Sequence, residues 1–296
     1  MQSRREFLQK MSLVGAGLAL SPLFPFIASA GIKPWFEISL AEWSLHRTIR
    51  GGKLKNIDFP AFAANEFGIH AVEYVSQFFK DESKDITYLK DLNARAADHN
   101  VKNVLIMIDR EGDLGDADVA KRKQAVENHY RWIDAAQELG CHAVRVNAAG
   151  KGTPEEVAKR VVESLTTLSS YGKGANIKVV VENHGGISSD GNWLSGVLAA
   201  VNLDNCGSLP DFGNFYEYDR YQGVTDLMPF AKGISAKSWD FDAQGMESKI
   251  DYPRMMKIVK DGGYSGYIGI EYEGETLDET QGIKLTKALL QRFQGE

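Results

Sequence analysis

The segment IKVVVENHGG, residues 177–186, decides the fold class of this chain. Its apolar run is short and rich in β-branched valine, which favours a buried strand over a helix. The run gives way at once to three polar side chains, Glu182, Asn183 and His184. In α/β folds built on parallel strands, functional groups collect at the carboxyl ends of the strands. We therefore expect Glu182 to stand at the end of a buried strand, in a site.

Two later segments repeat this pattern. GSLPDFGNF (207–215) and YIGIEYEG (267–274) place Asp211 and Glu271 after β-prone runs. Glu182 and Asp211 are 29 residues apart, and Asp211 and Glu271 are 60 apart. These separations are close to one and two strand-plus-helix units, each of about 31 residues in an eight-stranded α/β barrel.

Eight β-prone runs alternate with amphipathic stretches after residue 31, as in repeated strand-helix units around a parallel sheet. Residues at or next to the strand ends follow one another at intervals of 26 to 38 residues, which favours one closed barrel over two domains. We predict an α/β fold, a single (β/α)8 TIM barrel over residues 31–296. The expected strands are 37–43, 71–75, 103–108, 143–147, 178–182, 207–211, 232–237 and 267–271.

Residues 1–30 have the features of a twin-arginine signal peptide. Arg4 and Arg5 precede an apolar stretch over residues 11–27, which is followed by the small residues Ala28-Ser29-Ala30. Two glycines and two prolines interrupt this stretch, so we expect no stable membrane anchor. We predict that the twin-arginine export machinery carries the chain across the bacterial inner membrane, to a periplasmic or otherwise exported location.

The composition is that of an ordinary globular protein, with 43% hydrophobic and 25% charged residues. The net charge is −6, and it is −8 without the first thirty residues, which hold three basic and one acidic side chain. The sequence has no basic stripe or arginine-rich helix, which argues against nucleic acid as a partner. It leaves the oligomeric state open.

Glu182, Asp211 and Glu271 are the candidate metal ligands. Three carboxylates in one pocket repel each other unless a cation or shared protons offset their charge. A site made of oxygen ligands suits a hard divalent cation, so we expect Mn²⁺ or Mg²⁺. Any one of these residues alone would more simply be a solvated acid at a strand end. Their common position after three strands favours a joint site.

Other residues near the predicted strand ends are candidates for catalysis or substrate binding. His184 could act as a metal ligand, a general acid or base, or a hydrogen-bond donor, or it could be a loop histidine held by a backbone carbonyl. Lys237 could stabilise an enolate or an oxyanion, or it could pair with Asp240. The predicted sugar-binding residues are Trp43, His46, Asn147, Asn183, Asn214, Trp239 and Glu273.

These segments, together with GIHAVEYV (68–75) and YSGYIGIEYEG (264–274), resemble the xylose isomerase-like TIM barrels, which are known as sugar phosphate isomerases and epimerases. The resemblance covers nearly all of the chain after the predicted signal. The same superfamily includes apurinic endonucleases, but those need a histidine-rich site with several metals and a basic surface. The resemblance therefore implies a barrel that acts on sugars.

The family typically holds a divalent metal with Glu, Asp, His and Glu from strands five to eight. Glu182, Asp211 and Glu271 match three of these four ligands. At strand seven the usual His-x-Lys is Ser235-Ala236-Lys237, so a serine replaces the expected histidine. Near strand six the frequent Asp-x-x-His has Asn214 in the histidine position.

The resemblance implies a metal-dependent sugar isomerase or epimerase. Glu182 and Glu271 would exchange the proton next to the carbonyl through an enediolate, with Lys237 and His184 as further catalytic groups. We expect an unphosphorylated sugar or sugar derivative, because phosphosugars are mainly cytoplasmic and no P-loop cradle is present. Two alternatives stay open: a lyase or dehydratase that acts on a keto-sugar or keto-inositol at the same metal site, and a non-catalytic carbohydrate-binding barrel.

Overall fold

The computed structural model describes residues 34–295. The predicted twin-arginine signal, residues 1–30, lies outside the described residues and stays a prediction. Within residues 34–295, no helix combines the length and the apolar character that crossing a bilayer requires.

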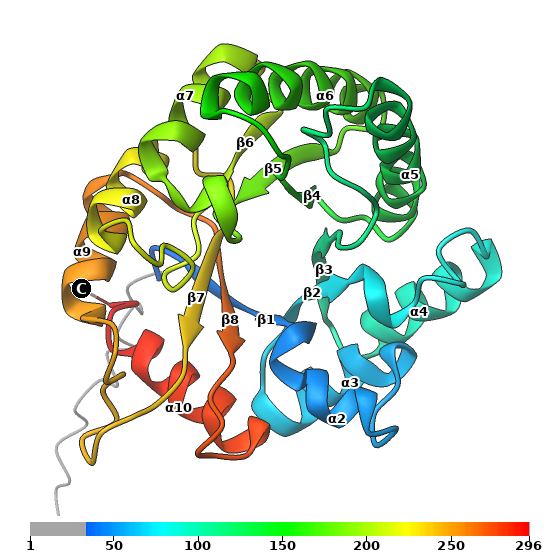
Figure 1. Cartoon of the computed structure of the whole chain (residues 1–296). Helices are drawn as coiled ribbons and strands as arrows, with labels where there is room; N and C mark the ends of the chain where they lie inside the picture. The colour runs from blue at the N-terminus through cyan, green and yellow to red at the C-terminus, as the bar shows by residue number, and fades with distance from the viewer. Residues whose placement is uncertain (1–33, 296) are drawn as a thin grey trace, which may run out of the picture. The chain divides into compact units, whose positions relative to one another are not determined.

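Eight parallel strands form a nearly closed barrel with helices around it (Figure 1), so the predicted TIM barrel is confirmed. Neighbouring strands follow the order β6-β5-β4-β3-β2-β1-β8-β7. The seam between β6 and β7 is spanned by isolated parallel bridges, Ser208 to Ala231 and Asp211 to Ser235. The strands are β1 (Glu37–Ala41), β2 (Ala71–Val75), β3 (Lys102–Met107), β4 (Ala143–Asn147), β5 (Lys178–Glu182), β6 (Cys206–Leu209), β7 (Ile234–Ser238) and β8 (Tyr267–Tyr272).

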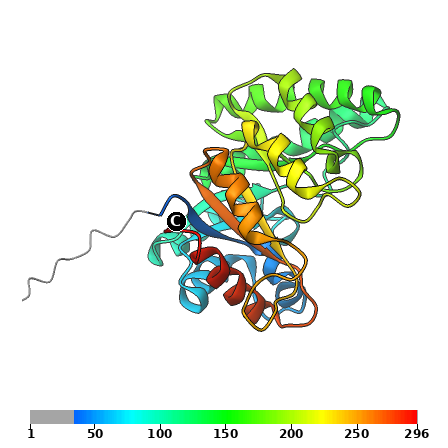
Figure 2. The same cartoon turned by 90° about the vertical axis from the view of Figure 1, so that its left-hand side faces the viewer.

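The helices cover the outside of the barrel (Figures 1 and 2). Most of them begin at an aspartate or threonine whose side chain accepts backbone N–H groups of the first turn, as Thr153 does in the expected capping box with Glu156. They are α2 (His46–Arg50), α3 (Phe59–Phe67), α4 (Ile86–Asp98), α5 (Val119–Glu138), α6 (Pro154–Gly174), α7 (Gly191–Val201), α8 (Arg220–Leu227), α9 (Tyr252–Asp261) and α10 (Glu279–Gln291).

Short 3₁₀ turns complete several of the connections. They are η1 (Glu42–Leu45), η2 (Asn56–Asp58), η3 (Ser76–Phe78), η4 (Gly186–Ser189) and η5 (Met228–Phe230).

The alternation of side chains along each strand separates two layers. In β5, Val179 and Val181 belong to the large apolar core, whereas Val180 belongs to a second, smaller apolar cluster. Glu182 follows Val180 by two residues and so faces the same side, the barrel interior. The same parity turns Glu271 of β8 inward, because Ile270 packs in the large core.

Three predicted strand boundaries were wrong by two residues, and two of them have a local cause. The first strand ends at Ala41 instead of Trp43, because η1 follows and buries Glu42, whose carboxylate accepts hydrogen bonds from Asn56 Nδ2 and the Val75 N–H. The sixth strand ends before Pro210, which has no N–H for the ladder. The seventh begins at Ile234, two residues later than predicted.

Candidate active site

The fold brings the three predicted metal ligands together inside the barrel. One carboxylate oxygen from each of Glu182, Asp211 and Glu271 lies within 4.8 Å of the other two. Glu182 and Asp211 have no exposed surface, and Glu271 is 4% exposed. We call these three residues the carboxylate cluster. Such burial of three acids requires neighbours that offset their charge.

Asp211 is held in place by groups on both of its sides. Its Oδ1 accepts hydrogen bonds from the backbone N–H groups of Gly213 (2.8 Å) and Asn214 (2.9 Å). The Asn183 side chain donates to the Asp211 carbonyl (3.0 Å) and accepts from the Asp211 N–H (2.8 Å). The amide of Asn183, predicted to bind sugar, is therefore engaged in positioning Asp211.

Ser235 lies between two members of the cluster. Its Oγ is 2.7 Å from Asp211 Oδ2 and 3.0 Å from Glu271 Oε2. A hydroxyl has one proton, so Ser235 donates to only one of these carboxylates at a time. Burial raises the pKa of Asp211 to about 7, although the positive charge of Lys237 opposes that rise. Asp211 therefore retains a proton to a higher pH than a solvated aspartate does.

Lys237 provides one built-in positive charge. Its Nζ lies 2.7 Å from Glu271 Oε1, 3.1 Å from Glu273 Oε2 and 3.8 Å from Asp211 Oδ2. Burial disfavours the ammonium, but these carboxylates outweigh it and keep the pKa of Lys237 above its usual value. Burial tends to raise the pKa of Glu271, but the positive charge of Lys237 outweighs burial and holds the pKa of Glu271 below its ordinary value. The alternative partner, Asp240, pairs with Lys249 instead.

Arg145 of β4 provides a second positive charge, which the sequence analysis missed. Its Nε forms an ion pair with Glu182 Oε2 (2.8 Å) that is not aligned as a hydrogen bond, and its Nη1 donates to Asp109 Oδ1 (2.7 Å). Burial raises the pKa of Glu182 to about 7 against the effect of Arg145. An arginine inside the apolar run AVRVN was the available signal for this role.

A cavity of about 310 Å³ opens at this end of the barrel, and we call it the strand-end cavity. Its wall includes five residues that sequence reasoning did not propose as site residues: Val75, Gln77, Asp109, Arg110 and Arg145. Gln77 and Arg110 lie just beyond β2 and β3, each two residues after the last apolar residue of its run, so the pattern that identified Glu182 was present there too. The lining residues are Trp43, Val75, Gln77, Asp109, Arg110, Arg145, Asn147, His184, Glu271 and Glu273.

Trp43 forms one wall of the cavity and is fixed from both sides. Its indole Nε1 donates to Glu273 Oε1. His46 stacks on the Trp43 ring with 4.9 Å between ring centroids, and its Nδ1 lies 2.7 Å from the Trp43 carbonyl oxygen. His46 therefore supports Trp43 and is not itself among the lining residues.

The remaining predicted site residues lie at different depths. His184 is exposed at the mouth of the cavity, where partial desolvation and the charge of Arg145 lower its pKa, so that its ring is neutral at pH 7. Asn147 donates to Asp109, and Asn214 donates to Glu182 Oε1 (3.1 Å). Trp239 packs over Gly213, where a Cβ would come within 2.4 Å of its ring, and does not line the cavity.

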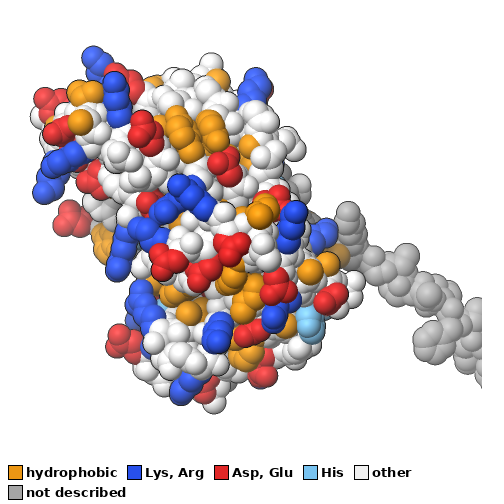
Figure 3. Space-filling view, turned by 90° about the vertical axis from the view of Figure 1, so that its right-hand side faces the viewer, with side chains coloured by type: hydrophobic (Ala, Val, Ile, Leu, Met, Phe, Trp, Pro, Cys, Tyr) orange, Lys and Arg blue, Asp and Glu red, His pale blue; other side chains and the backbone are white. Residues whose placement is uncertain are grey.

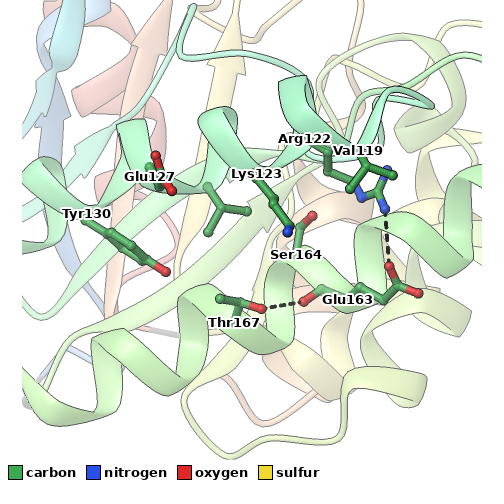
Figure 4. A pocket seen from close by; sticks show the side chains of 9 residues that line it. Val119, Arg122, Lys123, Glu127, Tyr130, Glu163, Ser164 and Thr167 are labelled. Carbon is green, nitrogen blue, oxygen red and sulfur yellow. Dashed lines mark hydrogen bonds and ion pairs between the residues drawn. The ribbon is translucent and has the colours of Figure 1, made fainter.

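A second cavity, of about 280 Å³, lies between α5 and α6 on the outside of the barrel (Figure 4). Its charged groups include Arg122, which pairs with Glu163 at 3.5 Å. It contains no residue from a strand end, so it does not share the chemistry of the carboxylate cluster. Elsewhere on the surface, Figure 3 shows a face on which Lys and Arg side chains are interspersed with Asp and Glu.

Residues 61–293 match the family model described as Xylose isomerase-like TIM barrel. The chain belongs to this family. A curated relative, the C-glycoside deglycosidase alpha subunit of Arthrobacter globiformis, is 38% identical over 65 residues. That match covers 21% of this chain and spans only 18% of the relative's length.

Solved structures of other xylose isomerase-like barrels share the fold at low identity, which supports no more than the fold. D-psicose 3-epimerase in the presence of D-fructose has a TM-score of 0.70 at 10% identity, covering 88% of this chain and 100% of that one. The 3-keto-D-glucoside 4-epimerase YcjR from E. coli has a TM-score of 0.66 at 14% identity, covering 88% and 100%. The IOLI protein with a bound zinc atom has a TM-score of 0.70 at 16% identity, covering 87% and 98%.

The carboxylate cluster fits a metal ion by its donor set. It offers three buried carboxylates and the Ser235 hydroxyl, all oxygen donors, as hard divalent cations prefer. Oε2 of Glu182 is buried and accepts no aligned hydrogen bond, although Arg145 Nε forms an ion pair with it at 2.8 Å. Lys237 and Arg145 compete for the same carboxylates, so a metal here would share their negative charge with two resident cations.

Proposed function

We propose that this protein is a metal-dependent isomerase or epimerase that acts on an unphosphorylated sugar or sugar derivative. The observation that carries the proposal is the contrast between two buried carboxyl groups in one cluster. The pKa of Glu182 is raised to about 7 by burial, whereas the pKa of Glu271 is held below its usual value, because Lys237 outweighs burial. Pairs of acids whose environments separate their pKa values are suited to acid and base roles.

Proton transfer is assigned to the two carboxyl groups. A divalent metal bound by Glu182, Asp211 and Glu271 would supply a Lewis acid for the carbonyl and hydroxyl oxygens of the sugar. One glutamate takes the proton from the carbon next to the carbonyl, the C–H electron pair forms the enediolate double bond, and the other glutamate returns a proton. Burial raises the pKa of Glu182 to about 7 when no metal is bound, which suits this residue to take up and to release a proton.

Other residues orient the substrate and stabilise its charge. The Lys237 ammonium, 2.7 Å from Glu271, is placed to stabilise the oxygen that becomes negative in the enediolate. The neutral ring of His184 at the cavity mouth can donate to or accept from a sugar hydroxyl. The Trp43 ring offers an apolar face to the C–H groups of a sugar. Similarity to D-psicose 3-epimerase and to 3-keto-D-glucoside 4-epimerase supports a small sugar as substrate.

The substrate is proposed to be met outside the cytoplasm, because residues 1–30 have the twin-arginine signal pattern. Replacing both Arg4 and Arg5 with lysine should retain the chain in the cytoplasm, as measured by immunoblots of periplasmic and cytoplasmic fractions. Unchanged periplasmic recovery of the variant would contradict this route.

Metal dependence is tested on the purified protein. We expect one equivalent of bound Mn²⁺ or Mg²⁺ by elemental mass spectrometry, and a rise of the melting temperature when either cation is added after chelation. A cation at about 100 times its Kd stabilises the folded state by about 2.7 kcal/mol. Asp211→Asn should lose this shift. A shift of equal size in the variant would exclude the carboxylate cluster as the site.

The reaction class is tested by NMR in D₂O with a panel of free and oxidised sugars. Deuterium that enters next to a carbonyl, with loss of exchange in Glu182→Gln, would support an isomerase or epimerase. Saturable binding without exchange or any new product would contradict the enzymatic proposal.

A lyase is the second candidate, and the match to the C-glycoside deglycosidase alpha subunit favours it. The same enediolate can expel a group bonded to the carbon beyond it, so that a C–O or C–C bond breaks and a double bond forms. The same NMR experiment separates the two candidates, since a lyase would give an unsaturated or cleaved product.

A further inference from the structure

A third cavity, of about 420 Å³, lies beside the strand-end cavity, and we call it the rim hollow. It is formed by the loops that follow β5 and β6, so it opens at the same end of the barrel as the carboxylate cluster. No residue of the proposed reaction lines it. Its lining residues are Gly186, Ser189, Asp190, Phe215, Tyr216, Glu217 and Tyr218.

Tyr216 is held in an unfavourable backbone conformation at this hollow. Its φ is +50°, in the left-handed region that side chains other than Gly, Asn and Asp rarely adopt. Its side chain is nevertheless 76% exposed, so apolar burial does not offset the cost of this conformation. Strained residues of this kind cluster at ligand sites, which makes a role in binding the natural hypothesis to test.

The residues on either side of Tyr216 are firmly anchored. Phe215 is 1% exposed and packs against Gly223, where a Cβ would lie within 2.1 Å of its ring. Tyr218 donates its N–H to the Phe215 carbonyl (2.9 Å) and its hydroxyl to Asp226 (2.8 Å). The Asn214 carbonyl accepts from Ser189 (2.6 Å). Tyr216 is therefore presented to solvent by a fixed turn.

The Tyr216 ring stands next to the strand-end cavity. It lies against Gly185, where a Cβ would be 3.9 Å from the ring, and Gly185 directly follows the cavity residue His184. Glu217, beside Tyr216, has no hydrogen bond or ion pair with any residue in the described range 34–295. A free carboxylate next to an exposed aromatic face is suited to a ring that carries hydroxyl groups.

We propose that the rim hollow binds a second ring, joined to the sugar in the strand-end cavity, so that the substrate is a glycoside that carries its carbonyl as a keto group on the ring, instead of a free monosaccharide. This inference rests on the proposed sugar chemistry of the carboxylate cluster. The second ring stacks on Tyr216, and Glu217 accepts hydrogen bonds from it where it carries hydroxyls. A second sugar and an aromatic aglycone both present a ring face that can stack on Tyr216, and the test distinguishes between them.

The test is equilibrium binding, by calorimetry on the metal-loaded protein, of methyl β-D-glucoside, phenyl β-D-glucoside and cellobiose. The wild type should bind a two-ring ligand more tightly than the methyl glucoside. Tyr216→Ala should remove this preference, by about threefold to tenfold for a ring contact, and leave the methyl glucoside unchanged. Tyr216→Phe should keep it. Loss in Glu217→Gln for cellobiose only would identify a second sugar, and preference for the phenyl glucoside only would identify an aromatic aglycone.

Two controls keep the outcomes distinct. Tyr216→Gly relieves the backbone strain, so it should match or exceed the wild type in melting temperature while it loses the two-ring preference. Equal binding of one-ring and two-ring ligands by the wild type would overturn the rim hollow as a binding site but not the proposed function. Failure of all three glucosides to bind would overturn the rim hollow as a glycoside site, whereas the proposed function is decided separately by the deuterium-exchange experiment. A Tyr216→Ala variant that changes only the oligomeric state would assign Tyr216 to contact with a second copy of the chain and overturn the inference.

Discussion

The two faces of the barrel strands are built from alternating residues of the same segments, yet they have opposite chemistry. The outer face is a continuous apolar core against the helices, with residues such as Val179, Val181 and Ile270. The inner face combines a small apolar cluster with buried charges, including Arg145 and Glu182. Burial of apolar surface on the outer face stabilises the fold, whereas burial of charged groups on the inner face costs folding free energy.

Substitution of the carboxyl groups on the inner face should have the largest effect, and the quantity affected is turnover. Glu182→Gln or Glu271→Gln keeps the shape but removes proton transfer, so turnover should fall by about 10²- to 10⁴-fold. Steady-state kinetics would measure it. Glu163→Gln is the control, because Glu163 of α6 pairs with Arg122 on the outside of the barrel and does not line the strand-end cavity. Near-normal turnover in both inner variants would refute the proposed roles.

Arg145→Met should reduce stability as well as activity. Removal of Arg145 leaves Glu182 and Asp109 without their buried counter-ion, which costs about 3 to 5 kcal/mol when a buried pair is broken. Urea unfolding would measure the loss. The double variant with Glu182→Gln should be less destabilised than the sum of the two single variants, since one unpaired charge is gone. Strict additivity would show that Arg145 and Glu182 do not interact.

Leu165→Ala tests the outer face alone. Leu165 of α6 has no exposed surface, so its truncation should lower the free energy of unfolding by about 2 to 5 kcal/mol. Turnover of the folded fraction should be unchanged, because the cavity is lined by inner-face and loop residues. A change in kcat at full folding would show that the two faces are coupled.

A pH dependence of stability is expected from Glu73, an inner residue of β2. Burial raises its pKa to about 8 from 4.5, so the folded protein keeps this proton while the unfolded chain loses it. Stability from Glu73 is full below pH 4.5 and falls as pH rises to 8, by up to about 1.4 kcal/mol per pH unit. Glu73→Gln should reduce the dependence of the free energy of unfolding on pH, as measured by urea unfolding between pH 5 and pH 8. Identical slopes in both proteins would contradict it.

The sequence was sufficient for the barrel and for the three carboxylates, because each ends an apolar run and their intervals match strand-helix units. It was insufficient for the role of Arg145: the arginine inside AVRVN was visible, but its ion pairs with Glu182 and Asp109 exist only once neighbouring strands are adjacent. Asn183 was expected to bind sugar, but its partner is the backbone of Asp211, a contact that exists only once β5 and β6 are adjacent. Likewise, Ser235 touches two carboxylates only through the alignment of β7 with β8 and the seam.

The carboxylate cluster lies at the seam between β6 and β7, where the barrel is held together by few backbone hydrogen bonds. Those that cross the seam include Ser235 N–H to the Pro210 carbonyl (2.9 Å) and Phe212 N–H to the Ser235 carbonyl (3.1 Å). Local opening costs less free energy where few backbone hydrogen bonds join two strands. We therefore expect the barrel to open locally between β6 and β7 before it opens elsewhere. Because Asp211 and Ser235 flank the seam, each opening would pull the carboxylate cluster apart. Amide hydrogen exchange at Phe212 and Ser235 should therefore slow when a ligand draws the two sides together.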